Sequence, residues 1–323
     1  MTTESKKAHN PIPLDKVVHK ATLNFRGLPP KNKSDRQEAR IIEVREGMTE
    51  GSFTASKALI GKGAMSSFDS AKKALMDYYY KNSLPPDAGK NSYVLVSNKY
   101  MQPFTTRMRE LVRATEDAFT EFLREYGHND PEKRTQWLHI QKQRLGGKYD
   151  ESDYPEPEKL ATDFKVTFNM TAFGDITKTA GMWVDHETLA LLDKQQADTD
   201  KVVSEYASQA VWERVIDPLE SIVERLSAPE DGDKANSKGG KTFRDSLVTN
   251  LRDIVQTLPA LNFQGDTRLE DVASKCKELL NGMENPDVLR RSPEKRETVR
   301  NEASDILDTI GGYSGKRSKK GAS

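Results

Sequence analysis

Hydrophobic residues spaced three or four positions apart predict a long amphipathic helix over residues 104–126. Because an α-helix completes a turn about every 3.6 residues, this spacing places the apolar side chains on one face and leaves arginines and glutamates on the other. A second helix is predicted over 131–145, where Asp130 is a suitable N-cap, Pro131 fits the first helical position and Gly146 follows the end. Since only a short turn separates the two helices, we expect them to lie antiparallel as a hairpin.

Alternation of apolar and polar positions predicts two β-strands, one over residues 17–25 and one over 164–170. Successive side chains of a strand point to opposite faces, so this pattern is typical of a strand with one buried face. Residues 93–96 are a third, shorter run that favours a strand. The other predictions in this part of the chain are a helix over 67–80, a short helix or strand around Ile41, Ile42 and Val44, and a loop over 152–159.

Residues 186–226 are predicted to be helical, with one interruption at Pro218. Asp217 is a suitable N-cap and Glu220 a suitable capping-box acid, so we expect a kink or a new helix there. Residues 228–240 are polar and contain several glycines, which is typical of a linker. Amphipathic helices follow over 243–258, over 267–283 with a capping box from Thr267 to Glu270, and over 292–310. Because short isolated helices are marginal in water, we expect these three to pack together or on the main body.

Together these elements predict a mainly α fold with a minor β component, an α+β arrangement with a long amphipathic helical hairpin, a few short strands and a C-terminal helical bundle. The expected organisation along the chain is a disordered N-terminus at 1–13, a main α+β helical domain at 14–227, a linker at 228–240, a C-terminal helical module at 241–312 and a basic disordered tail at 313–323.

Composition adds to this picture. Charged residues make up 31% of the 323 residues and hydrophobic residues 35%, which indicates a large hydrated surface typical of elongated helical proteins. Lys and Arg total 50, as do Asp and Glu, so the chain lacks the net positive charge of a dedicated nucleic-acid binder. The single cysteine, Cys276, indicates a reducing compartment. With no apolar core of a signal peptide and no membrane-length run, we expect a cytoplasmic protein without membrane contact.

The motifs that resemble catalytic or metal sites are better explained structurally. Gly61-Lys62-Gly63 lacks the spacing and the following Ser or Thr of a phosphate-binding loop, so we interpret it as a turn. The triplet 185–187 is interpreted as a capped helix start, His128 as part of the turn before Asp130, and Cys276 as a core residue on its helix's apolar stripe. We therefore assign no catalytic, cofactor-binding or metal-binding residue and expect a non-enzyme without a cofactor.

The basic tail is the one candidate contact site in the sequence. Its cations, with no acid among them, favour either contact with nucleic acid or an acidic partner, or a solvated end that aids solubility. These residues are Lys316, Arg317, Lys319 and Lys320.

Several short motifs follow one another through the middle of the chain. In order they are Asn98-Lys99-Tyr100, the helix ending Phe122-Leu-Arg-Glu-Tyr126, Leu145-Gly146-Gly147-Lys148-Tyr149, Asp153-Tyr154-Pro155 and Phe164-Lys-Val-Thr-Phe168. This succession, covering roughly residues 90–230, resembles an uncharacterised family found in phages and bacteria. Genes of that family often lie near a MoxR- or CobS-like AAA+ ATPase and a von Willebrand A-domain protein. The resemblance implies a protein partner of one of these kinds; the family has no established site residues to transfer.

The resemblance implies a non-catalytic, phage-type accessory or adaptor protein, in the host cytoplasm if phage-encoded, that binds a macromolecular partner in an ATPase-driven remodelling system. One alternative is a nucleic-acid-binding protein of phage replication or packaging, which the basic tail favours and the neutral net charge opposes. Another is a self-associating structural or assembly protein, so a homo-oligomer stays open as well.

Overall fold

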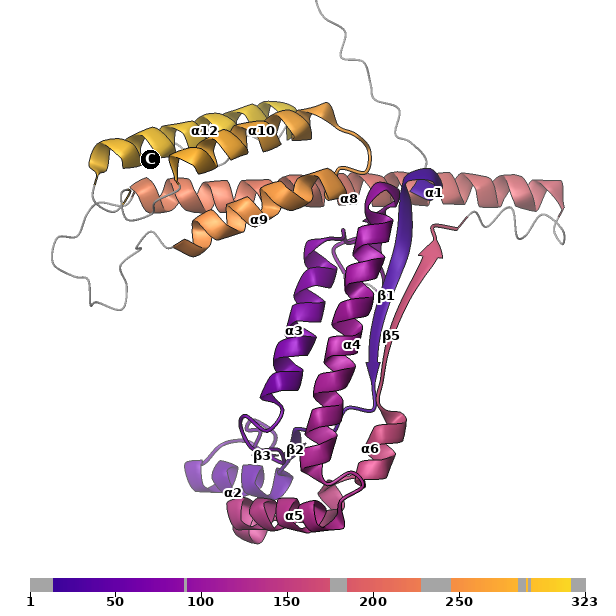
Figure 1. The fold of residues 1–323 in the computed structure, drawn as a ribbon, viewed down its shortest axis with the longest axis vertical. Helices are drawn as coiled ribbons and strands as arrows, with labels where there is room; N and C mark the ends of the chain where they lie inside the picture. Colours follow the sequence, from indigo (N-terminus) through magenta and orange to yellow (C-terminus); the bar gives the residue numbers. More distant parts are fainter. Residues whose placement is uncertain are drawn as a thin grey trace, which may run out of the picture. The chain divides into compact units, whose positions relative to one another are not determined.

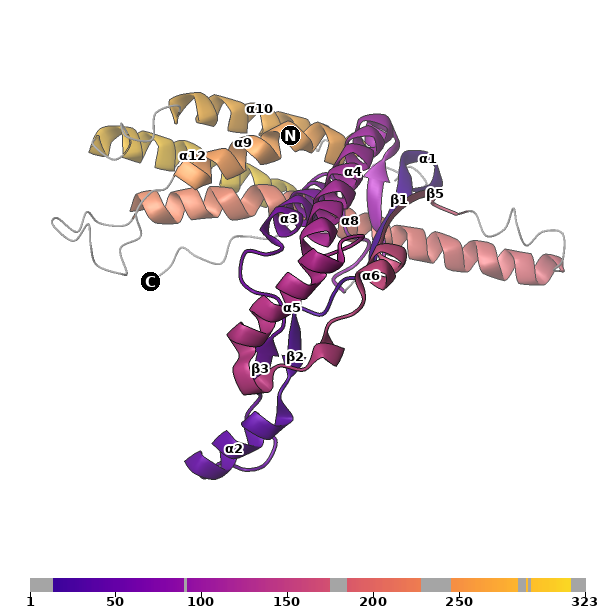
Figure 2. The same ribbon diagram turned by 60° about the horizontal axis from the view of Figure 1, so that its bottom comes forward.

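The computed structural model describes residues 14–89, 92–174, 185–227, 245–283, 289 and 292–314. The predicted disordered N-terminus, the predicted linker at 228–240 and the four basic residues of the tail lie outside these ranges. Within them the chain is mainly helical with a minor β component, which confirms the predicted fold class (Figures 1 and 2). Its strands form a three-stranded sheet in the order β4-β1-β5 and a two-stranded sheet, β2-β3.

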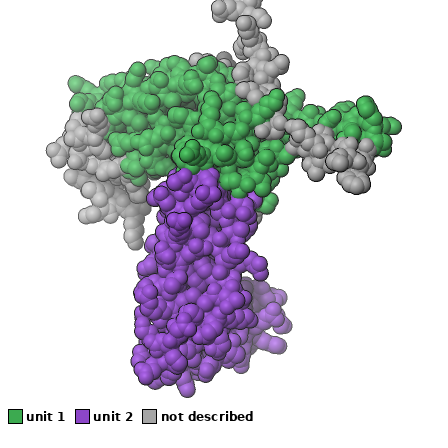
Figure 3. Space-filling model, turned by 45° about the vertical axis from the view of Figure 1, so that its right-hand side comes forward, with its two compact units in different colours: residues 1–21, 80–104, 170–323 green, residues 22–79, 105–169 purple. Residues whose placement is uncertain are grey.

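The chain divides into two compact units, coloured separately in Figure 3. The boundaries between them fall inside β1, α3, α4 and β5, so each of these elements contributes residues to both units. Unit 1 comprises residues 1–21, 80–104 and 170–323, and unit 2 comprises residues 22–79 and 105–169. This division differs from the predicted one, in which residues 14–227 form one domain and the C-terminal helices another.

The C-terminal helices share the apolar core of unit 1 with residues 203–226. Four helices pack together in this unit (Figure 1): α8 (His186–Ser227), α9 (Asp245–Leu261), α10 (Thr267–Gly282) and α12 (Pro293–Ser314). α9 and α12 contact α8, and α10 contacts α9 and α12. Each helix is apolar along one stripe only, so each must cover the stripes of its neighbours. The buried stripe of α8 consists of Val203, Ala207, Val211, Val215, Leu219, Ile222 and Leu226.

Three details of these helices differ from the sequence predictions, and one agrees with them. No new helix begins at Pro218; the proline is buried inside a single α8, where packing on the other helices holds the backbone helical despite the lost hydrogen bond. The side chain that caps α10 belongs to Asp266 instead of Thr267, and it accepts a hydrogen bond from the Arg268 amide at 3.0 Å. α12 continues through Gly311 and Gly312 to Ser314. As predicted, Cys276 is buried in the core, and burial raises its thiol pKa to about 12.

The predicted strands are confirmed. β1 (Val18–Arg26) pairs antiparallel with β4 (Val94–Ser97), with Val18 opposite Ser97 and Ala21 opposite Val94. β5 (Lys165–Ala172) is the third strand of this sheet. A short helix, α1 (Leu14–Val17), precedes β1, and the 3-10 helix η1 (Asn98–Tyr100) follows β4. Ala21 is buried as the alternation predicts, whereas Leu23 and Phe25 are only half-buried; Val18, three positions before Ala21 and therefore on the opposite face of the strand, is buried as well.

Aromatic residues form the core of unit 2. Phe119 of α4 (Met101–Tyr126) stacks on Phe164 with ring centroids 3.7 Å apart. It also meets the edge of Phe68 of α3 (Ser66–Lys81) at 5.4 Å. Such pairs add to the free energy gained by burying the rings. About two turns further along α4, Tyr126 packs against Trp137 with ring centroids 5.2 Å apart.

α5 (Pro131–Leu145) begins at the predicted cap, where Asp130 accepts a hydrogen bond from the Lys133 amide, but it does not form the predicted antiparallel hairpin. Instead it runs across the end of α4 (Figure 1). Gly127 has φ +102°, and a Cβ there would lie 2.5 Å from the Arg134 backbone, so the turn is tight. α5 lacks a continuous apolar stripe that would hold it along α4.

The predicted loop over 152–159 is wrong in part. The 3-10 helix η3 (Glu151–Asp153) overlaps its start, and α6 (Pro157–Asp163) begins within it. Pro157 at the start of α6 is the usual position for proline in a helix, so the sequence did carry a signal for this helix.

An arginine of α8 caps the C-terminal end of α3. The Arg214 guanidinium donates hydrogen bonds to the carbonyl oxygens of Tyr80, Lys81 and Ser83 at 3.0, 2.9 and 2.7 Å. The last carbonyls of a helix have no partner within the helix, and a cation there also interacts favourably with the helix dipole. Burial lowers the pKa of this guanidinium.

We expect Arg214→Met to lower the free energy of unfolding by about 2 kcal/mol, because the three carbonyls lose a charged donor while the aliphatic part of the side chain is retained. Urea denaturation of the full chain measures the change. Arg252→Met, on the exposed face of α9, is the control and should change stability by less than about 0.5 kcal/mol. Equal effects of the two substitutions would contradict a capping role for Arg214.

Candidate functional site

Unit 2 contains a two-stranded antiparallel ribbon with a short helix inserted in the connection between its strands. β2 (Asn32–Ser34) pairs antiparallel with β3 (Ser56–Ala58), and α2 (Arg36–Glu46) lies on the chain between them. Ser34 lies opposite Ser56, and the Asp35 amide donates a hydrogen bond to the Ala55 carbonyl at 2.9 Å. The two ends of the connection that contains α2 are therefore held side by side. The ambiguous region around Ile41 and Val44 is therefore helical.

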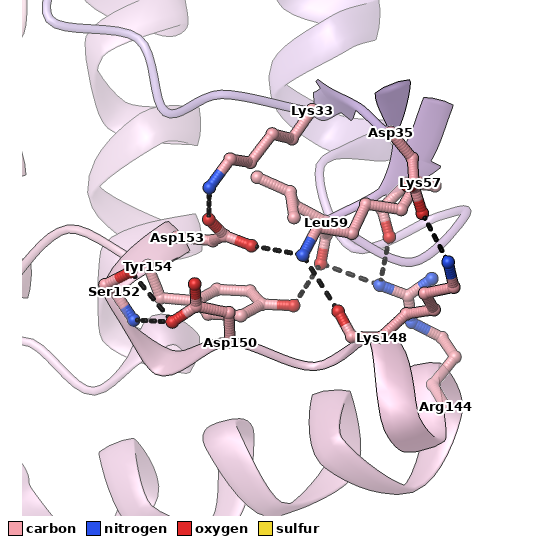
Figure 4. Close-up of polar contacts among 11 residues, drawn as sticks. Lys33, Asp35, Lys57, Leu59, Arg144, Lys148, Asp150, Ser152, Asp153 and Tyr154 are labelled. Carbon is pink, nitrogen blue, oxygen red and sulfur yellow. Dashed lines mark hydrogen bonds and ion pairs between the residues drawn. The ribbon is translucent and has the colours of Figure 1, made fainter. Parts of the chain in front are cut away.

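Asp153 is the centre of the polar network beneath this ribbon (Figure 4). Its side chain is only 1% exposed and forms ion pairs with two lysines. Oδ1 pairs with the Lys33 ammonium of β2, and Oδ2 pairs with the Lys57 ammonium of β3 at 2.6 Å. A buried carboxylate is costly unless it is paired, so two cations from the two strands meet that requirement. The carboxylate thus ties both strands of the ribbon to η3.

The network continues from Lys57 to the first turn of α2. The Lys57 ammonium also donates to the Lys148 carbonyl at 2.8 Å. The Lys148 ammonium in turn pairs with Asp35 at 3.1 Å and with Glu38 at 3.0 Å. Asp35 is the N-cap of α2 and its carboxylate accepts from the Glu38 amide at 3.0 Å. The Asp35 carboxylate therefore starts the helix and, together with the Glu38 carboxylate, positions it through Lys148.

Two further contacts attach β3 to its neighbours. The Arg144 guanidinium of α5 donates to the carbonyls of Ala58 and Leu59 at 2.6 and 2.7 Å. The Tyr154 hydroxyl donates to the Leu59 carbonyl at 3.2 Å. These carbonyls lie at and just beyond the end of β3, where the ladder with β2 no longer provides donors.

The pKa shifts follow from these contacts. Burial alone would raise the pKa of Asp153, but the hydrogen bonds and charges of Lys33 and Lys57 outweigh it and leave the pKa lowered. The Glu38 amide and then Lys148 lower the pKa of Asp35, while Glu38 and Asp35 raise that of Lys148. All three groups are thus held in their charged forms, each paired within the cluster, an arrangement suited to fixing segments in place.

The outward side of α2 and the segment after it expose apolar side chains. Ile41 is 52% exposed and Val44 is 76% exposed; Met48 and Phe53 are exposed as well. On the inner side Ala39 and Glu43 are buried, and the Glu43 carboxylate accepts from the Phe53 amide at 2.9 Å. A surface helix normally turns its aliphatic side towards the core. We call Ile41, Val44, Met48 and Phe53 the outer face of α2.

A shallow hollow in unit 1 is the second candidate. It encloses about 390 Å³ between α9 and α10, with Leu258 and Leu269 among its apolar lining and Lys99 and Lys277 among its charged lining. Its buried amide, Asn262, already exchanges hydrogen bonds with the Asp266 backbone at 2.8 and 3.0 Å. The amide that would orient a ligand is thus occupied, and the outer face of α2 is the stronger site.

The residues singled out in the sequence do not gather at this site. Gly63, in the predicted turn, has φ +90°, and Asp185 caps α8 as expected, accepting from the Thr188 amide at 2.8 Å. In the described part of the chain, His, Cys, Asp and Glu side chains form no group of three that could hold a metal ion. None of the described helices combines the length and apolar character needed to cross a membrane.

Sequence reasoning missed the network and the outer face of α2. Asp35 and Glu38 have the spacing of a helix start, which was a usable signal. Asp153 lies 120 positions from Lys33, and no local pattern reports such a pairing.

Comparisons with protein-family models, with curated proteins and with solved structures found no match to this chain.

We expect Asp153→Asn to lower the free energy of unfolding by about 2–3 kcal/mol near neutral pH, because it leaves two lysines without their counter-ion. A carboxylate with a lowered pKa stabilises the folded state above the pKa of an unfolded aspartate, about 4, and loses this contribution as pH falls through its folded value. The difference between Asp153→Asn and the unmodified protein should therefore shrink below about pH 4. Urea denaturation at both pH values measures it.

Glu151→Gln is the matched control, because Glu151 is exposed in the same turn. It should change stability by less than about 0.5 kcal/mol at either pH. If Asp153→Asn is no more destabilising than Glu151→Gln, the network does not hold the ribbon in place.

Proposed function

We propose that this protein is a non-catalytic adaptor that binds a protein partner through the outer face of α2. The observation that carries the proposal is the exposure of Ile41 and Val44 on a helix that polar contacts position from its inner side. Contiguous exposed apolar residues on a soluble protein are typical of interaction surfaces. Their positioning by a paired network also reduces the ordering cost of binding.

The candidate partner comes from the family resemblance. An AAA+ ATPase or a von Willebrand A-domain protein is the kind of partner that the resemblance implies, in a phage-type remodelling system. We place the interaction in the cytoplasm, where the single thiol of Cys276 stays reduced without a bridging partner.

Affinity purification of the tagged full-length protein from the cells that produce it, with ATP present and recovery quantified by mass spectrometry, tests the proposal. Ile41→Ser combined with Val44→Ser should reduce recovery of the ATPase or von Willebrand A protein by about 10-fold or more, because two aliphatic anchors are lost. Both side chains are exposed, so the melting temperature should hardly change.

The matched control is Ile140→Ser, which removes a 55% exposed isoleucine from α5 in the same unit. It should leave recovery unchanged. If the double variant recovers as much partner as the control does, α2 is not the docking surface. Recovery that depends on intact DNA or RNA would favour the nucleic-acid alternative instead.

A further inference from the structure

The charges beside the outer face of α2 restrict what can bind there. Arg40 precedes Val44 by four positions and Arg45 follows Ile41 by four, so each arginine is a surface neighbour of one aliphatic residue. Arg40 is exposed and makes no hydrogen bond or ion pair within the described structure. Among the described residues Arg45 pairs only with the adjacent Glu46, and both side chains are exposed, so that pair exchanges easily for a better one.

The acidic residues of α2 are already engaged. Glu38 pairs with Lys148 at 3.0 Å, Glu43 is buried against the Phe53 amide, and Glu46 pairs with Arg45 at 2.8 Å. Of the charges on α2 itself, Arg40 is therefore a cation that no described carboxylate neutralises, whereas Arg45 and Glu46 neutralise each other.

We infer that the outer face of α2 docks an amphipathic helix of a partner protein whose aliphatic stripe is flanked by Asp and Glu side chains. Ile41 and Val44 lie three positions apart on α2, a spacing at which two helices interlock side chains, and the exposed Met48 follows just beyond the helix end at Gly47. α2 has 11 residues and is about 16 Å long, so it matches about three turns of a partner helix. This inference rests on the proposed function and adds the chemistry of the partner.

The same charges disfavour two other occupants. A second copy of this chain would bring Arg40 and Arg45 of both copies together at the contact, and like charges at an interface oppose association. A helix that lies in a membrane surface relies on a large excess of cations, whereas the unneutralised charge that α2 presents beside its outer face within the described structure is that of Arg40.

Two synthetic helical peptides of about 20 residues provide the test, since shorter peptides are poorly helical alone. Both carry the same leucine stripe, flanked by glutamates in one and by lysines in the other. Fluorescence anisotropy with the full-length protein should show the glutamate peptide binding at least about 10-fold more tightly, with affinity falling as salt is added. Arg40→Glu combined with Arg45→Glu should reverse this preference.

Arg109→Glu combined with Arg113→Glu is the control, because it makes the same change in net charge on the exposed side of α4. It should leave the preference for the glutamate peptide intact. Equal binding of the two peptides, or reversal by the control variant, would overturn the inference.

The outcomes also separate the two proposals. If serine at positions 41 and 44 abolishes partner capture but charge reversal at Arg40 and Arg45 does not, the adaptor function stands and the acidic partner is wrong. If neither change alters capture, both proposals fail. A dimer in sedimentation that Val44→Glu dissociates, or flotation with anionic phosphatidylserine vesicles, would replace the partner helix with a second copy or a lipid surface.

Discussion

The requirement that a buried carboxylate be neutralised governs the ribbon of unit 2. Asp153 is removed from water, so Lys33 and Lys57 must converge on it, and they can do so only if the strands that carry them lie side by side. Each strand has three residues, too few for a ribbon that is stable alone. Ion pairs and hydrogen bonds therefore do for this part of the chain what an apolar core does elsewhere.

This arrangement explains how α2 can expose aliphatic residues. A helix that packs on a core must turn its apolar stripe inwards, whereas α2 is held at its first turn by Lys148 and further along by the contact of Glu43 with the Phe53 amide. Its aliphatic side is left uncovered. The helices of unit 1 differ in this respect, because α8 and its neighbours bury their apolar stripes against one another.

Much of the helical and strand content could be predicted from the sequence because it depends on short-range periodicity. The stripe of α4, the alternation in β1 and the cap at Asp130 are all readable within a few residues. The failures involve competition between local preference and distant packing. Pro218 favours a helix start locally, but the bundle keeps it inside α8. The site depends on pairs such as Lys33 with Asp153, which no local window contains.

The burial of Cys276 has a practical consequence for following the bundle of unit 1. The thiol lies among aliphatic side chains with a pKa of about 12, so in the closed state it is both inaccessible and uncharged. Thiol reagents react with the thiolate, so labelling requires α10 to separate from its neighbours. Because the chain has one cysteine, the rate of modification by a single reagent reports how often this bundle opens in an otherwise unaltered protein.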